Sequence, residues 1–119
     1  MPRRRKHWGW GFEDEQPGGA ELRDAATGLA AHLGFGVPEP AMPAPVALPA
    51  PRLDVPSGWA TDDHARALAA HGASYLDVVR AFRGEFPHPP DAVARPGDES
   101  ELAAVLAWCA ERGVAAIPR

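Results

Sequence analysis

Apolar side chains recur at helical spacing in the first third of the chain. Between residues 20 and 33 they follow one another at steps of three and four, which places them on one stripe of a helix. Gly34 suits the left-handed position that ends such a helix. The pattern therefore predicts a helix within residues 20–36, with an apolar stripe made of Leu22, Ala25, Ala26, Leu29 and Leu33.

Two short helices are predicted within residues 61–88. Thr61 can cap the first helix, its opening turn is acidic, and Gly72 can end it. Ser74, with an aspartate three positions later, begins a second capping pattern, and this helix ends near Gly84. The segment is expected to form a helical pair that meets at Gly72.

The last quarter of the chain, residues 89–119, predicts strand, helix and strand. Val93 lies in a short strand stopped by a proline, Asp98 begins a helix that Gly113 ends, and Ile117 lies in a second strand. Such a βαβ unit places Val93 and Ile117 side by side in one parallel sheet. Parallel strands need cover on both faces, and this chain has too little apolar mass to supply it. The predicted fold class is therefore α+β, in which an arm and helices precede a truncated βαβ unit.

Two segments show no helical or strand period. Residues 1–19 are rich in charge, tryptophan and glycine and predict an arm that needs a surface to cover. Residues 37–60 contain seven of the fourteen prolines and predict an extended connector, because proline fixes φ and has no N–H to donate. The connector is either a stiff link within a larger fold or a docking segment for an aromatic-lined groove.

Charge and composition exclude several classes of protein. A formal net charge of −4 argues against a surface built for nucleic acid or an anionic membrane. The basic tip Arg3-Arg4-Arg5-Lys6 is either a solvated terminus or a contact for phosphate or lipid. No apolar stretch is long enough to predict a transmembrane segment. Cys109 is the only cysteine, so no internal disulfide forms, and a reducing cytoplasm is the expected location.

Four landmarks resemble one known family, the flavin-binding oxidases of the vanillyl-alcohol oxidase type, and within it the alkyldihydroxyacetonephosphate synthases. The family's tryptophan-glycine arm is similar to residues 6–11, and its helical segment before the flavin domain is similar to residues 66–80. Its first flavin-domain strand resembles residues 90–96, and its first helix and second strand resemble residues 101–118. The likeness spans nearly the whole chain and is weakest across the connector.

The resemblance implies the N-terminal portion of an FAD-dependent enzyme. Its partners would be FAD and a lipid precursor or other small molecule, with exchange of an acyl for an alkyl chain on dihydroxyacetone phosphate, or a related flavin oxidation. In the family, a glycine-rich loop that cradles the flavin pyrophosphate follows the position of Pro118, so Pro118 marks the edge of the cofactor site. The family's catalytic region also lies beyond this point, so this portion is expected to be inactive by itself. The alternative is a non-enzymatic interaction module that uses the connector and the basic tip.

Single residues that could perform chemistry have structural explanations as well. Asp62 and Asp63 lie at a predicted helix start, and His71 lies where it can cap a helix end, so none is assigned to catalysis. Cys109 lies on an apolar stripe, where a buried thiol is inert. The tryptophans are expected to be packing anchors. No metal site is predicted, because no i, i+4 pairing links the histidines His7, His32, His64 and His88.

Overall fold

The computed structural model describes residues 2–119, and its regular structure is almost entirely helical. The elements are η1 (Glu13–Glu15), α1 (Gly19–Leu33), α2 (Asp63–Ala70), α3 (Tyr75–Phe82) and α4 (Glu99–Arg112). Extended pairing within the described residues is limited to two isolated antiparallel bridges, Arg5 with Phe12 and Ala60 with Val93. No helix in residues 2–119 is long and apolar enough to cross a lipid bilayer.

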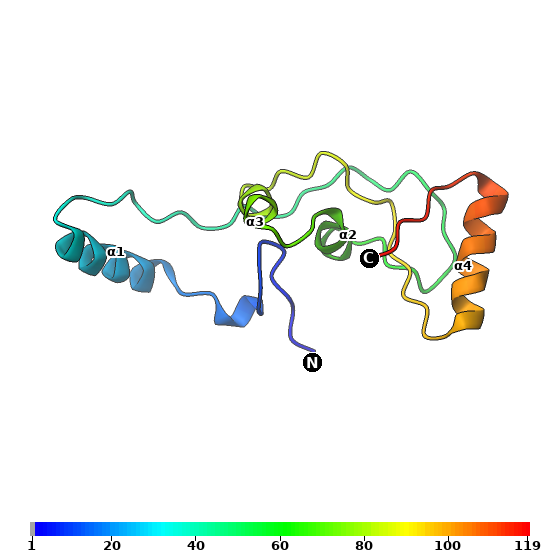
Figure 1. The fold of residues 1–119 in the computed structure, drawn as a ribbon, viewed down its shortest axis with the longest axis horizontal. Helices are drawn as coiled ribbons and strands as arrows, with labels where there is room; N and C mark the ends of the chain where they lie inside the picture. Colours follow the sequence, from blue (N-terminus) through cyan, green and yellow to red (C-terminus); the bar gives the residue numbers. More distant parts are fainter. Residues whose placement is uncertain (1) are drawn as a thin grey trace.

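The chain is elongated. It measures 61 × 30 × 22 Å, with a radius of gyration of 18.6 Å, whereas a compact domain of this length has a radius of about 13.5 Å. Figure 1 shows α1 at one end, α2 and α3 in the middle, and α4 at the other end. The predicted helix at residues 20–33 is present as α1, but it contains no buried residue, and Leu29 and Leu33 are 51% and 45% exposed.

Local capping signals place the helix ends close to their predicted positions. The Ser74 hydroxyl accepts from the Asp77 amide and starts α3, and the Asp98 carboxylate accepts from the Glu101 amide and starts α4. Gly34 and Gly113 follow α1 and α4 with φ of 76° and 63°, a conformation that side chains with a Cβ disfavour. The start of α2 differs by one residue, because the cap is Asp62, whose carboxylate accepts from Ala65, instead of Thr61.

The core is small and lies around α2 and α3. Ala67, Ala81 and Phe86 are buried together. Partly buried apolar side chains from the arm, the connector and α2 pack against them: Trp8, Val46, Leu48 and Ala70. The helices themselves make almost no direct contact with one another, so the irregular segments between them complete the core.

The connector runs along this core as an ordered strand-like segment. The Ala44 amide donates to the Phe82 carbonyl at 2.8 Å, and the Leu48 amide donates to the Asp63 carboxylate at 3.1 Å. The Arg52 amide donates to the Asp91 carboxylate at 2.8 Å. These donors are non-proline residues spaced four apart, so the segment is held at the positions where an N–H is available.

The predicted βαβ unit is not formed by the described residues. Its helix is present as α4, but Val93 exchanges both hydrogen bonds of an antiparallel bridge with Ala60, at 3.0 and 2.9 Å, and does not pair with Ile117. Ile117 is 88% exposed, and the Val114 amide donates to Cys109 at the end of α4. A parallel pair uncovered on both faces has no apolar burial to stabilise it, which explains the difference.

A buried cation links α2 to the loop that precedes α4. Arg66 is 2% exposed, and its Nε donates to the Pro90 carbonyl at 2.8 Å. Its Nη1 lies 3.4 Å from the Asp63 carboxylate, one turn earlier in α2. A buried guanidinium depends on such partners, because an uncompensated charge in the interior is costly.

Arg66→Ala is expected to lower the free energy of unfolding by about 3 kcal/mol, because it removes a buried charged donor and leaves the Pro90 carbonyl unpaired. Urea denaturation followed by circular dichroism measures the change. Arg95→Ala, at an exposed arginine, is the control and is expected to stay within about 0.5 kcal/mol of the wild type. A loss below about 1 kcal/mol for Arg66→Ala would contradict the central role of this side chain.

The ion pair of Arg52 and Asp91 makes stability depend on pH. The Arg52 side chain and amide hydrogen-bond the Asp91 carboxylate and lower its pKa to about 2, from about 3.9 in an unfolded chain. The pair therefore stabilises the fold above the unfolded pKa, and this contribution is lost as the pH falls through about 2.

Asp91→Asn should be less stable than the wild type at pH 7, and the difference should vanish near pH 2 in urea titrations. Asp54→Asn, at an exposed carboxylate of the connector, should show no such convergence.

Candidate functional site

Three places in the chain were candidates for a functional site: the segment around Pro118, a hollow beside the connector, and a cluster of histidines and a glutamate. Pro118 lies in the extended, exposed segment that follows α4. This segment returns toward α2, where the Arg119 guanidinium donates to the Leu68 carbonyl (Figure 1).

The segment around Pro118 does not provide a cradle for a pyrophosphate. Such a cradle needs several backbone N–H groups that converge on the phosphate oxygens, usually from glycine-rich turns or a helix N-terminus. Pro118 has no N–H, and the residues from Val114 to Arg119 are extended, with no helix start among them. The segment from Val114 to Arg119 therefore offers no set of converging amides for a pyrophosphate.

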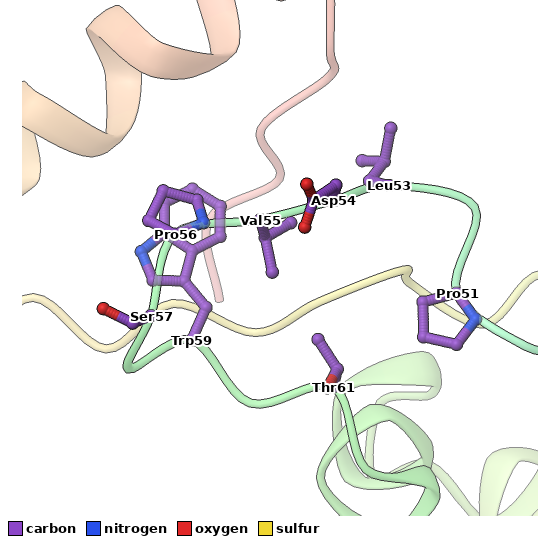
Figure 2. A pocket seen from close by; sticks show the side chains of 8 residues that line it. All are labelled: Pro51, Leu53, Asp54, Val55, Pro56, Ser57, Trp59 and Thr61. Atoms are coloured by element: carbon purple, nitrogen blue, oxygen red, sulfur yellow. The ribbon is translucent and has the colours of Figure 1, made fainter.

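The hollow beside the connector has a volume of about 360 Å³ and is shallow. Figure 2 shows the eight side chains that surround it, which come from the connector and the residue that precedes Asp62. Trp59 offers an aromatic surface, but the only charged group in the lining is the carboxylate of Asp54. An anionic cofactor would meet no cation there, so the hollow is poorly suited to a nucleotide phosphate.

The third place brings together residues that are far apart in the sequence. His7 and Glu13 come from the arm: His7 lies in the loop closed by the bridge between Arg5 and Phe12, and Glu13 follows Phe12. His64 comes from the first turn of α2. One nitrogen from each ring and one carboxylate oxygen lie within 4.8 Å of one another. We call these three residues the His–Glu–His cluster.

Each histidine of the cluster has one nitrogen available for a further partner. The His7 Nε2 lies 3.1 Å from the Ala44 carbonyl and donates to it, which leaves Nδ1 with its lone pair. The His64 Nδ1 is buried, has no hydrogen-bond partner and lies 3.9 Å from Glu13 Oε1. Sequence spacing alone did not reveal this arrangement, since its members come from separate segments.

The surroundings favour the neutral form of both rings. Burial lowers the pKa of His7 and of His64 below the ordinary value, and the nearby Arg4 cation acts in the same direction on each. Arg4 Nε also lies 3.3 Å from Glu13 Oε1, so a cation already neutralises the carboxylate. The cluster therefore combines one carboxylate with two imidazoles whose pKa values lie below the ordinary value.

The other residues singled out in the sequence have structural roles. The Asp62 carboxylate caps α2, and the Asp63 carboxylate bonds the connector and Arg66. The His71 ring follows α2, lies 2.7 Å from the Glu85 carbonyl through Nε2, and packs on Phe86. Cys109 is buried in α4, as expected.

Three of the four tryptophans pack within the chain. Trp8 packs against the core, and Trp59 and Trp108 form an edge-to-face pair with ring centroids 5.0 Å apart. Trp10 is 66% exposed. The pair of Trp59 and Trp108 joins α4 to the connector, and Cys109 is the one buried residue of α4.

Comparisons of the chain with models of protein families, with curated proteins and with solved structures find no match.

Trp108→Ala is expected to detach α4 from the connector, because it removes the aromatic pair while the helix caps stay intact. Hydrogen–deuterium exchange should show faster exchange of the amides in Glu99–Arg112, by about tenfold or more, with α2 unchanged. Leu102→Ala, at a side chain that is 45% exposed, is the control and should leave exchange in α4 nearly unchanged. Equal effects of the two substitutions would show that Trp108 does not anchor the helix.

Proposed function

We propose that this chain is the front part of a flavin-linked oxidoreductase, with residues 89–119 at one edge of the FAD-binding domain and the preceding residues as scaffold. The observation that carries the proposal is the resemblance of four sequence landmarks, in order and spacing, to the alkyldihydroxyacetonephosphate synthases. The single cysteine favours a cytoplasmic location. As the resemblance implies, the whole enzyme would act on a lipid precursor or related small molecule.

The helix of the proposed βαβ unit is consistent with this assignment. It begins after Asp98 and ends at Gly113, and extended segments flank it on both sides. Leu102, Leu106 and Ile117 are 45%, 50% and 88% exposed. In a completed flavin domain Leu102 and Leu106 would cover a parallel sheet that contains Ile117, because such a sheet needs an apolar layer on each face.

A neighbouring strand would pair with the second edge of the backbone around Val93. In an antiparallel bridge, the N–H and C=O of one residue point to the same side, so Val93 directs both groups toward Ala60. The groups of the residues on either side of Val93 point to the opposite edge. A strand in that position would convert the bridge into part of a mixed sheet.

This chain would contribute scaffold and not chemistry. In flavin enzymes the cofactor performs the redox step, and the protein binds and orients it. No catalytic residue is assigned among residues 1–119, and the pyrophosphate cradle is proposed to lie after Pro118.

The structure gives no support to the alternative of an interaction module. In the basic tip, Arg3 pairs with Asp14 and Glu15 at 2.7 Å each, and Arg4 pairs with Glu13. The connector packs on the core through Val46 and Leu48, and the backbone amides of Ala44, Leu48 and Arg52 donate hydrogen bonds to the rest of the chain. Both segments are engaged within the chain, which favours a stiff internal connection over a free docking motif.

Two measurements test the flavin proposal. The purified 119-residue chain, mixed with FAD and then desalted, should retain no flavin absorbance, because it lacks a pyrophosphate cradle. A longer protein, in which the chain is continued by the polypeptide encoded after the Arg119 codon, should retain one FAD per chain. Stoichiometric retention by the 119-residue chain would contradict the proposal, and so would a continuation without a glycine-rich loop.

The longer protein also allows a matched pair of variants. Leu106→Asp places a charge on the side of α4 proposed to cover the sheet and should reduce flavin retention at least about tenfold. Ala107→Asp places the same charge on the opposite side of the helix, at an exposed position, and should retain flavin normally. Normal retention by Leu106→Asp would show that this side of α4 covers no sheet.

A further inference from the structure

We propose that His7, Glu13 and His64 bind one divalent transition-metal ion, with zinc as the best match, and that the ion fastens the arm to α2. This inference is independent of the proposed flavin function, because the cluster lies on the arm and α2, away from α4 (Figure 1).

The donor set is one that zinc uses in proteins. Two histidines and one glutamate, with a fourth position open to water, form a recurrent three-ligand zinc site. The imidazoles favour zinc and related transition metals, whereas magnesium and calcium prefer sites made of oxygen ligands. A cluster of acidic side chains alone would not favour zinc over magnesium or calcium.

The distances require only small movements of side chains. Zinc with bonds of 2.0–2.2 Å places neighbouring ligand atoms about 3.4 Å apart in a tetrahedron. The His64 Nδ1 and Glu13 Oε1 atoms are already 3.9 Å apart, and no two of the three ligand atoms are more than 4.8 Å apart. Small rotations of the three side chains would close the remaining gap, and Glu13 is 34% exposed.

The environment of each histidine favours a ligand. The Ala44 carbonyl accepts a hydrogen bond from the His7 ring, which is the kind of outer contact that fixes a metal-binding imidazole in its tautomer and orientation. The His64 Nδ1 is buried without a hydrogen-bond partner, although its side chain as a whole is 16% exposed. A buried polar atom without a partner is costly, and an ion bound at this nitrogen would remove that cost.

Arg4 competes with the proposed ion for the Glu13 carboxylate. Arg4, which is 60% exposed, holds the same Glu13 oxygen that faces His64. Metal binding must displace this guanidinium or turn the carboxylate toward the histidines. Arg4 therefore weakens the site, and this gives a variant that should gain affinity.

Isothermal titration of the full chain with Zn²⁺, after removal of metals by a chelator, tests the site. The wild type should bind one ion per chain, and Glu13→Gln and His64→Ala should each weaken binding at least about tenfold. Arg4→Ala should tighten binding about fivefold, because a cation beside the ion is removed. His32→Ala, at an exposed histidine of α1, is the control and should bind as the wild type does.

Hydrogen–deuterium exchange distinguishes metal binding at the His–Glu–His cluster from binding elsewhere on the chain. It also tests the proposal if His64→Ala fails to fold. Zn²⁺ should slow amide exchange in residues 5–13 of the wild type and not of Glu13→Gln, a variant that changes only a partly exposed side chain. Absence of saturable binding to the wild type would overturn the proposal. Undiminished binding by Glu13→Gln, or a loss of binding in His32→Ala equal to that in His64→Ala, would also overturn it.

Discussion

The structure depends on the hydrogen bond between the buried Arg66 guanidinium and the Pro90 carbonyl. Arg66 lies in the middle of α2, and Pro90 begins a short stretch that also receives the connector through Asp91 and the bridge with Ala60 through Val93. Because the helices hardly touch one another, these polar links perform the task that helix packing performs in most domains. Without the hydrogen bond from Arg66 to Pro90, the links through Asp91 and Val93 would no longer be held to α2.

The alanine-rich composition explains why polar links carry so much of the structure. Two of the three residues at the centre of the core are alanines, Ala67 and Ala81, and each buries far less apolar surface than leucine or phenylalanine would. Phe86 is the one large side chain among them. Hydrogen bonds to the connector and to the loop at Pro90 then determine which irregular segments lie against α2 and α3.

Features that depend on neighbouring residues could be predicted from the sequence, and features that depend on distant partners could not. The capping pair of Ser74 and Asp77 and the glycine after α4 determine helix ends through contacts within a few residues. The pairing of Val93 depends on which strand lies beside it, and the described residues show Val93 paired with Ala60 and not the expected pairing with Ile117. The His–Glu–His cluster and the burial of Arg66 join the arm, α2 and the Pro90 loop, and no local spacing encodes these contacts.

The two proposals meet at α2, although they rest on separate observations. His64 in its first turn would bind the ion, and Arg66 two residues later holds the loop from which the proposed flavin sheet starts. An ion that fastens the arm would therefore restrain the same helix that positions Val93. The coupling would run through short-range contacts: a metal bond to His64, the two residues of α2 from His64 to Arg66, and the hydrogen bond from Arg66 to Pro90. In that arrangement the arm would stabilise the position of the first strand of the proposed sheet through α2, without a direct contact. The arm would then have a structural role in a fold whose helices do not pack together.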